Sequence, residues 1–326
     1  MTASAAIYGL SGTALSPEEA AFFQDAPPWG FILFTRNIDT PDQVRRLTGD
    51  LRTTIGRDAP ILIDQEGGRV QRMGPPHWTK WEPMRDLCEA AGDELARCSA
   101  ISARYAAIAA ELRDVGIDVN CVPVLDVPQP NAHPIIGDRA FGWNPADIAV
   151  RGREASAALL AGGVLPVIKH LPGHGRALAD SHEDLPRVNT ELAELRQIDF
   201  MPFRAMRDAV LGMTAHIVYD AIDPDACATL SPKAIDLIRR EIGFDGLLMT
   251  DDLSMKALSG SMRDRTKGAL DAGCDVILHC NGEMDEMTAI ASETPRLSGK
   301  GLARAEAAEG ARIKIETGGI AAATAA

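Results

Sequence analysis

Residues Gly246–Asp252 read GLLMTDD, an apolar run that ends in two adjacent acidic residues. The apolar residues are consecutive and do not alternate with polar ones, which is typical of a strand buried on both faces of a parallel sheet covered by helices. In such proteins ligands bind beyond the carboxyl ends of the strands. The stretch therefore predicts a buried parallel sheet, and it places Asp251 and Asp252 at the edge where a functional site is expected.

Similar apolar runs recur along the chain and alternate with longer amphipathic stretches. Eight such runs in 326 residues leave about 41 residues for each strand and its following helix, which is enough for one β-α unit. This alternation predicts an α/β protein, with a single (β/α)8 barrel domain over residues 1–316 and a frayed Gly- and Ala-rich tail over residues 317–326. A doubly wound open sheet is the structural alternative. The expected strands are Ala5–Gly9, Gly30–Phe34, Pro60–Ile63, Val119–Leu125, Val164–Ile168, Gly212–Ala215, Gly246–Met249 and Asp275–Leu278, and the expected helices are Pro41–Ile55, Leu87–Val115, Asn144–Ala161, Thr190–Arg207, Ser231–Ile242 and Met262–Ala272.

Several helix starts are marked by their own residues. Thr40-Pro41 and Ser231-Pro232 each place a hydroxyl N-cap before a proline at the first helical position, a combination that favours a helix start. Ser16 is followed three residues later by Glu19, the pattern of a capping box. These residues predict where three helices begin.

The charge and composition exclude several classes of protein. The chain has 33 basic and 46 acidic residues, a net charge of −13, which opposes non-specific binding to nucleic acid or to an anionic membrane. No apolar run approaches the ~18 residues of a membrane-spanning helix, and the first basic residue is Arg36, so we expect no secretory signal. Six cysteines without a C-x-x-C pair are typical of reduced, buried thiols. We therefore expect a cytoplasmic protein, and no stripe of residues indicates its oligomeric state.

Polar residues follow the expected strands at six places. A single charge after a strand is usually a helix cap or a surface residue. In a barrel, however, the carboxyl ends of all strands meet at one rim, so six such ends together predict an active site there. The six ends are 64–69 (DQEGGR), Asp126 with 137–139 (GDR), 169–175 (KHLPGHG), His216, Asp251-Asp252 and His279.

The segment 169–185, KHLPGHGRALADSHEDL, is rich in groups that bind metals or transfer protons. His170, His174, His182 and Asp180 are all of metal-ligand type, but the Pro and Gly between them argue against a helical H-E-x-x-H site. Alternatively, Asp180 orients His182 and stabilises its cation, as the third member of a catalytic triad does. A solvated loop in which Asp180 caps a turn is the structural alternative, and the segment alone does not choose among the three.

The two acids at 251 and 252 point to opposite sides if strand geometry continues to the end of the run. One then faces the centre of the rim and the other caps the following helix, but the apolar pattern does not say which. A carboxylate opposite a proton donor is the minimum equipment of a retaining glycosidase, in which one group attacks the anomeric carbon and the other protonates the leaving oxygen.

Three motifs together resemble those of the family 3 glycoside hydrolases, specifically the bacterial cytoplasmic β-N-acetylglucosaminidases of cell-wall recycling. They are DQEGGRVQR (64–72), KHLPGHG…DSH (169–182) and TDDLSM (250–255), and three long motifs in one order are far more specific than a single short one. The resemblance extends from the N-terminal strand to the strand after Asp251. It implies a one-domain barrel that removes terminal N-acetylglucosamine (GlcNAc) from (anhydro)muropeptides with retention of configuration, without a metal or organic cofactor.

The resemblance also implies roles for individual residues. Asp251 matches the nucleophile that forms a covalent glycosyl-enzyme, and His182 matches a histidine general acid/base on a mobile loop, with Asp180 as its orienting partner. The departures are Leu171, where the family usually has Phe, and the less polar stretch 176–178, and they leave the aglycone preference open. The residues implied to hold the GlcNAc hydroxyls are Asp64, Arg72, Arg139, Lys169 and His170.

Two other functions stay open at this stage. A metal-dependent hydrolase on the same barrel would use His170, His174 and His182 around zinc. A catalytically silent sugar-binding protein would keep the barrel without turnover, but the intact set of Asp251, Asp180 and His182 argues against it. No residue pattern explains a preference for the acetamido group.

Overall fold

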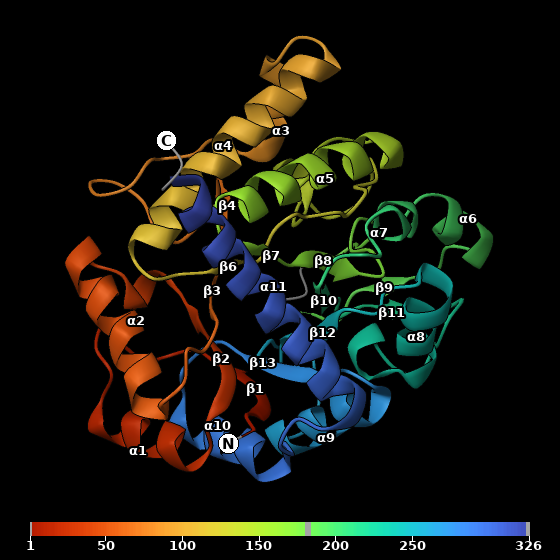
Figure 1. Ribbon diagram of the computed structural model, residues 1–326. Coiled ribbons are helices and arrows are strands. Elements are labelled where there is room, and N and C mark those ends of the chain that lie inside the picture. The colour runs from red at the N-terminus through yellow and green to blue at the C-terminus, as the bar shows by residue number, and fades with distance from the viewer. Residues whose placement is uncertain (1, 180–183, 324–326) are drawn as a thin grey trace.

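The computed structural model describes residues 2–179 and 184–323, with side chains described as far as Arg312. Its main sheet consists of parallel strands that surround a common axis in the order in which they occur in the chain (Figure 1). Two small two-stranded sheets lie outside it. The main strands are β1 (Ser4–Tyr8), β2 (Pro28–Leu33), β3 (Ile61–Ile63), β6 (Val119–Asn120), β7 (Leu165–Pro166), β8 (Ile168–Leu171), β10 (Leu211–Thr214), β12 (Leu247–Asp252) and β13 (Val276–His279), and the small sheets pair β4 (Gln65–Gly67) with β5 (Val70–Gln71) and β9 (Arg187–Val188) with β11 (Val218–Tyr219).

The main sheet closes into a barrel where β7 and β8, two short consecutive strands, together occupy the fifth of eight strand positions. Strand β7 pairs with β6, strand β8 pairs with β10, and only Val167 separates β7 from β8. The Val167 N–H donates to the Asn120 carbonyl at 3.0 Å and the Lys169 N–H to the Pro123 carbonyl at 3.1 Å, so backbone bonds continue across this join. Each strand is a neighbour of the next one in the sequence, and the strand order does not reverse as it does in a doubly wound sheet. The predicted (β/α)8 barrel is therefore confirmed.

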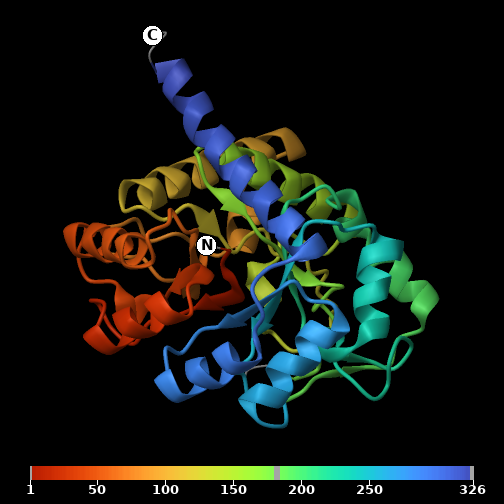
Figure 2. The same cartoon turned by 60° about the horizontal axis from the view of Figure 1, so that its bottom comes forward.

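Helices surround the barrel and connect successive strands (Figure 2). The predicted bounds Pro41–Ile55 and Met262–Ala272 are confirmed to the residue. The helices are α1 (Pro17–Asp25), α2 (Pro41–Ile55), α3 (Met84–Ala90), α4 (Glu94–Asp114), α5 (Pro145–Ala161), α6 (Leu192–Gln197), α7 (Met201–Ala205), α8 (Pro232–Leu237), α9 (Met262–Ala272), α10 (Met284–Glu293) and α11 (Gly299–Ala323).

The three predicted helix starts are confirmed by their hydrogen bonds. The Thr40 side chain accepts the Gln43 N–H at the start of α2, and Ser231 accepts the Ala234 N–H at the start of α8. Ser16 and the Glu19 carboxylate form both bonds of the capping box that begins α1. These caps satisfy N–H groups that a helix cannot satisfy internally.

Several expected elements differ in extent from the structure; the helix expected over residues 231–242, for example, is α8 followed by a π-helical turn over Ile238–Ile242. The expected helix over residues 87–115 is two helices, α3 and α4, because Asp93 accepts the Ala96 N–H and begins a new helix there. The expected helix over residues 190–207 is likewise divided into α6 and α7, the second with Pro202 in its first turn. The expected strand over residues 119–125 has a regular ladder only in β6, since Pro123 has no N–H to donate.

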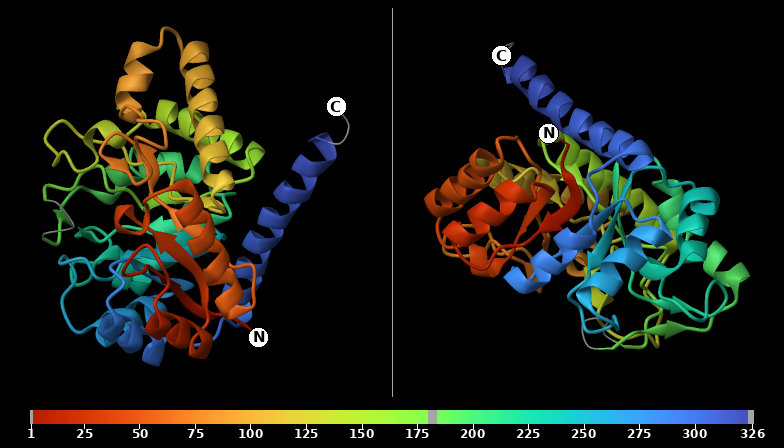
Figure 3. Two further views of the ribbon diagram at one scale, coloured as in Figure 1. Left: turned by 90° about the vertical axis from the view of Figure 1, so that its left-hand side faces the viewer. Right: turned by 90° about the horizontal axis from the view of Figure 1, so that it is seen from below.

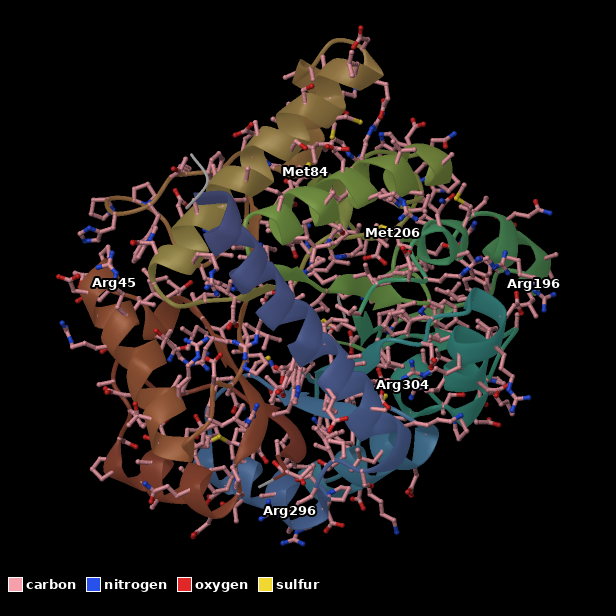
Figure 4. The ribbon with its side chains drawn as sticks, viewed as in Figure 1. Arg45, Met84, Arg196, Met206, Arg296 and Arg304 are labelled. Atoms are coloured by element: carbon pink, nitrogen blue, oxygen red, sulfur yellow. The ribbon has the colours of Figure 1, made fainter. Side chains whose placement is uncertain are left out.

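The helix α11 covers the amino-terminal end of the barrel (Figures 1 and 2). Its buried Ala305 and Ala308 pack in the same apolar cluster as the side chains of the barrel interior. Arg304, labelled in Figure 4, places one guanidinium nitrogen 3.0 Å from Asp275 before β13, and Arg312 lies 2.7 Å from Asp118 before β6.

The end of α11 extends beyond the body of the molecule (Figure 3). This helix continues to Ala323, so the segment expected as a tail, residues 317–326, begins within it. Among the helices described, none is both long enough and apolar enough to cross a membrane. The carboxyl-terminal rim, at the end of the barrel opposite α11, is left to the loops that follow the strands.

Candidate active site

A pocket of about 400 Å³ lies at the carboxyl-terminal rim of the barrel. Its lining includes apolar side chains from the top of the barrel interior, Ile32, Met213 and Leu278. The strand ends and the loops after them supply its polar groups. Six residues predicted from the sequence line this pocket together: Asp64, Arg72, Arg139, Lys169, His170 and Asp251.

A tight hairpin after β3 brings Arg72 back to Asp64. The buried Gln65 side chain accepts the N–H groups of Arg72 and Met73, each at 3.0 Å, and donates to the Met73 carbonyl at 2.8 Å. The turn requires the left-handed conformation at Gly68, whose φ is +60°, a conformation that glycine adopts without strain. As a result one Arg72 guanidinium nitrogen lies 3.0 Å from Asp64 Oδ2.

Two carboxylates and two cations form a buried cluster at one wall of the pocket. Lys169 Nζ lies 2.9 Å from Asp64 Oδ1 and 2.7 Å from Glu66 Oε1. The Arg139 guanidinium binds the Glu66 carboxylate with two bonds, of 2.8 and 2.9 Å. Such forked, charge-assisted bonds fix the orientation of both groups, so the side chains that line this wall are held in place before any ligand arrives.

The electrostatics of the cluster keep all of these groups charged. Burial raises the pKa of the Asp64 carboxyl, but Lys169 and Arg72 outweigh it and hold that pKa well below its ordinary value. Burial also raises the pKa of Glu66, but Arg139 and Lys169 outweigh burial and lower that pKa to about 2. For Lys169, burial lowers the pKa while the two carboxylates raise it above its ordinary value. At neutral pH the wall therefore presents fixed charges and hydrogen-bonding groups.

Asp126, which follows β6, binds the ring of His170 and the backbone at His174. Its Oδ2 lies 2.6 Å from His170 Nδ1, and its Oδ1 accepts the backbone N–H of His170 at 3.2 Å and that of His174 at 2.6 Å. Asp126 is fully buried, so it acts through the histidines. The bond to Nδ1 leaves the other ring nitrogen of His170 directed elsewhere, which is how a carboxylate usually fixes an imidazole.

The two acids at the end of β12 have different surroundings, and both line the pocket. Asp252 binds its own turn: its carboxylate accepts the Ser254 N–H at 3.0 Å, the Ser254 hydroxyl at 2.6 Å and the Cys280 N–H at 3.1 Å. The Asp251 carboxylate accepts the Asp252 N–H at 2.8 Å. One acid thus stabilises the turn and ties it to the end of β13. The expected cap of the following helix was wrong, because α9 begins only at Met262 and its N-cap is Ser261.

Three of the side chains expected at strand ends, those of Asp126, His216 and His279, are not among the residues that line the pocket. His216 is buried between Thr229 and the Asp252 carbonyl, at 2.7 and 3.0 Å, and His279 is buried against Glu286 of α10 at 2.8 Å. Asp126 lies behind His170. The rim prediction was wrong for the side chains of His216 and His279 because they point into the packing between strands and helices.

The expected acid/base pair and part of the expected metal cluster lie outside the described residues. Asp180 and His182 fall in the gap at residues 180–183. Within the parts of the chain that the structure describes, no three His, Cys, Asp or Glu side chains are grouped to hold a metal ion. The His170 and His174 rings are 5.5 Å apart, and both residues are bound by Asp126.

The buried His174 predicts a dependence of stability on pH. Burial and the neighbouring His170 lower the pKa of His174 to about 4, whereas an unfolded chain protonates histidine near pH 6.5. The unfolded state therefore binds the extra proton as the pH falls below about 6.5, and His174 costs about 2–3 kcal/mol of folding stability by pH 4.5. We expect urea unfolding between pH 7.5 and 4.5 to show a steeper loss for the wild type than for His174→Asn.

The prediction is tested by the difference in unfolding free energy between the wild type and His174→Asn at each pH. Burial raises the pKa of Asp199 to about 6. A carboxyl with a raised pKa makes the folded state more stable as the pH falls, which opposes the effect of His174 over the same pH range. Asp199 is present in both proteins, so it cancels. Parallel pH profiles for the wild type and His174→Asn would contradict the prediction.

Two parts of the site were not predicted from the sequence. Glu66 is one, although its position two residues after Asp64 is a usable signal, because residues i and i+2 of an extended segment share a face. The other is Phe34 and Arg36 after β2, which line the pocket. The Arg36 Nε donates to the Leu10 carbonyl at 2.7 Å, and its guanidinium lies 5.1 Å from the centre of the Phe34 ring. No sequence pattern distinguishes them from other residues at a strand end.

Comparison with known proteins gives one consistent answer. Residues 13–305 match the glycosyl hydrolase family 3 N-terminal domain. A β-hexosaminidase from Methylococcus capsulatus is 36% identical over 315 residues, which cover 95% of this chain and 92% of that protein. The structure of native NagZ from Neisseria gonorrhoeae has a TM-score of 0.86 and 30% identity, covering 100% of this chain and 97% of that one. NagZ from the same organism in complex with N-trifluoroacetyl-D-glucosamine has the same TM-score and identity, over 94% of this chain and 90% of that one.

A closed barrel with a charged pocket at its carboxyl-terminal rim, about the size of one sugar unit, suits a glycoside hydrolase. The relatives are glycoside hydrolases too. The chain belongs to glycosyl hydrolase family 3. Within that family it is a β-hexosaminidase. The resemblance first drawn from three motifs is thereby confirmed, while the roles of the individual residues stay predictions.

Proposed function

We propose that the protein is a retaining exo-β-N-acetylglucosaminidase that removes terminal GlcNAc from peptidoglycan-derived (anhydro)muropeptides. The observation that carries the proposal is that Asp251 lines the same pocket as the charged wall containing Asp64, Arg72 and Lys169. A pocket of about 400 Å³ with the barrel interior as its floor has room for one sugar residue, which suits removal of a terminal unit. The complex of NagZ with N-trifluoroacetyl-D-glucosamine supports an N-acylglucosamine as the bound sugar.

The charged wall binds the hydroxyls of the terminal sugar. Asp64 offers carboxylate acceptors, Lys169, Arg72 and Arg139 offer donors, and His170 is oriented by Asp126. Hydroxyls are both donors and acceptors, so a rigid array of both kinds binds them with little loss of freedom on binding. In this arrangement the sugar is held with its anomeric carbon toward Asp251.

In the first step the Asp251 carboxylate attacks the anomeric carbon while the bond from that carbon to the leaving oxygen breaks. His182, as an imidazolium, gives its proton to the leaving oxygen, so the aglycone departs as a neutral alcohol. In the second step water attacks the same carbon, the bond to Asp251 breaks, and His182 takes the proton from that water. Two inversions give net retention of the β configuration.

The roles of His182 and Asp180 rest on their match to the motif, because both residues lie outside the described part of the chain. Asp180, two residues away, would steady the imidazolium that forms after water attack. Each step of this scheme uses side chains and water alone. The muropeptide aglycone rests on the family relationship, and the six free cysteines suit the reducing cytoplasm where such fragments are recycled.

The proposal predicts turnover that survives removal of metals. We expect the protein to hydrolyse p-nitrophenyl β-N-acetylglucosaminide at an unchanged rate after exhaustive chelation and dialysis. Proton NMR of the early product should show β-GlcNAc before mutarotation. Loss of activity on chelation, with recovery on adding zinc, would favour the metal-dependent hydrolase instead, and absence of turnover in the untreated protein would favour a sugar-binding protein.

A further inference from the structure

Glu66 is a carboxylate that lies behind the pocket. Its side chain is 5% exposed, and it is not among the described residues that line the pocket. It therefore influences a bound sugar only through the groups it holds. Those groups are Lys169 from β8 and Arg139 from the loop after β6, two cations that reach the pocket from different parts of the chain.

The contacts of Glu66 use both of its oxygens. Oε1 accepts from Lys169 Nζ at 2.7 Å and from one terminal nitrogen of Arg139 at 2.8 Å, and Oε2 accepts from Arg139 Nε at 2.9 Å. In the described part of the chain, Glu66 is the carboxylate paired with Arg139, whereas Lys169 and Arg72 also share Asp64. Without the charge on Glu66, three cations would face one carboxylate in a buried site.

The position of this cluster opposite Asp251 connects it to the shape of the sugar. Asp251 is the next-to-last residue of β12. Going round the barrel, β12 is four strand positions from β3 in either direction, so the two strands lie on opposite sides. A pyranose whose anomeric carbon meets Asp251 therefore directs the far side of its ring, with the hydroxyls on carbons 3 and 4, toward the wall after β3, β6 and β8.

We propose that Glu66 is the positioning residue that sets the sugar specificity of the pocket: by fixing the spacing of Lys169 and Arg139, it selects the configuration of the ring hydroxyls that face them. This inference rests on the proposed function, since it takes Asp251 as the group at the anomeric carbon. The depressed pKa of Glu66, about 2, supports it, because the carboxylate keeps its charge across the working range of any enzyme assay.

The substitution Glu66→Gln separates this role from simple space filling. A glutamine has the same shape, but one of its two terminal atoms is an NH₂ group that donates and cannot accept. If the amide oxygen accepts from Lys169, the NH₂ faces the Arg139 Nε–H, and in the other orientation it faces Lys169. In the first orientation Arg139 keeps only the bond from its terminal nitrogen, and in the second Lys169 loses its bond to residue 66. At least one of the two cations is therefore held less firmly in either case.

The experiment measures KM and kcat/KM for two 4-epimers, the p-nitrophenyl β-glycosides of GlcNAc and of N-acetylgalactosamine. For Glu66→Gln we expect the KM for the GlcNAc substrate to rise at least about tenfold, and the preference for GlcNAc to fall at least about tenfold, as the loss of a charge-assisted bond implies. Glu66→Asp keeps the charge but is one methylene shorter. Its KM for the GlcNAc substrate and its preference for GlcNAc should both lie between those of the wild type and those of Glu66→Gln. KM and the epimer preference do not depend on the fraction of folded protein, so a loss of stability alone leaves them unchanged.

Asp118→Asn is the matched control. Asp118 is also a buried carboxylate shared by two cations, at 2.8 Å from Arg52 and 2.7 Å from Arg312, but at the opposite end of the barrel. It should lower stability while leaving KM and the epimer preference within about twofold of the wild type.

The outcomes separate the inference from the proposed function. Values of KM and epimer preference for Glu66→Gln within about twofold of the wild type would overturn the inference. If Glu66→Gln does not fold, KM and the epimer preference are measured on Glu66→Asp instead, and values unchanged from the wild type would again overturn the inference. Absence of turnover by the wild type would overturn the proposed function itself.

Discussion

Replacing Asp251 by alanine is expected to lower kcat for a β-GlcNAc glycoside by at least about 1,000-fold, because a methyl group cannot form the bond to the anomeric carbon on which both steps depend. The change removes the bond from the Asp252 N–H to Asp251 but keeps the bonds from Asp252 to Ser254 and Cys280 that hold the turn at the end of β12. Steady-state kinetics measure the loss. Incubation with a 5-fluoro glycoside followed by peptide mass spectrometry should label Asp251 in the wild type and give no label in Asp251→Ala.

Two controls test this prediction: rescue of Asp251→Ala by azide, and the substitution Asp252→Asn at the adjacent acidic residue. A small anion can occupy the space left by the carboxylate, so added azide should restore turnover of an activated substrate by Asp251→Ala and give the α-glycosyl azide. Asp252→Asn keeps an oxygen for the Ser254 N–H and should retain activity within about tenfold of the wild type. Normal turnover by Asp251→Ala, or a 5-fluoro label on another residue, would contradict the assignment of the nucleophile.

The fold was predictable because its signal is local and repeated. Each barrel strand is a short apolar run, as in Leu-Leu-Met before Asp251, and most of these runs are followed by a helix-length amphipathic stretch. What local pattern could not show is where a helix is interrupted. The break between α3 and α4 depends on the Asp93 cap, and apolar spacing continues across it.

The site was predictable in part, because strand ends in a barrel are brought together whatever lies between them. Asp64 and Lys169 are 105 residues apart and meet at 2.9 Å. The direction of a side chain at a strand end depends on register and packing, which the sequence does not display. This is why His216 and His279 are buried among their neighbours, and why the supporting roles of Glu66 and Asp126 became visible only in three dimensions.

Replacing Lys169 by methionine is expected to have the second-largest effect. The Lys169 side chain is 3% exposed, and its ammonium contacts the carboxylates of Asp64 and Glu66. Methionine fills a similar volume but leaves the two acids facing each other, and removing one partner of a buried charge cluster costs about 3–5 kcal/mol. We expect urea unfolding at pH 7 to show this loss. We also expect kcat/KM to fall at least about 100-fold, since the proposed function makes Lys169 a buried, charge-assisted donor to the sugar.

The loss of stability in Lys169→Met should depend on pH in a definite direction. In the wild type the pKa of Glu66 is about 2, below its ordinary value of 4.5, so its contribution is present above pH 4.5 and is lost as the pH falls toward 2. Without Lys169 the pKa of Asp64 and of Glu66 rises, and protonation then relieves the repulsion between them. The difference in unfolding free energy between wild type and variant should therefore be largest near pH 7 and shrink as the pH falls below 4.5.

An exposed ion pair gives the control, and a double variant gives the decisive comparison. Lys233 lies 3.3 Å from Asp223 with its side chain 65% exposed, so Lys233→Met should cost no more than about 1 kcal/mol. In the Glu66→Gln background one of the two acids is already neutral, so Lys169→Met should cost at least about 1 kcal/mol less than it does in the wild type. Additive losses would mean that Lys169 and Glu66 act independently, and the wall of the pocket would then be a set of separate contacts, each replaceable without disturbing the other.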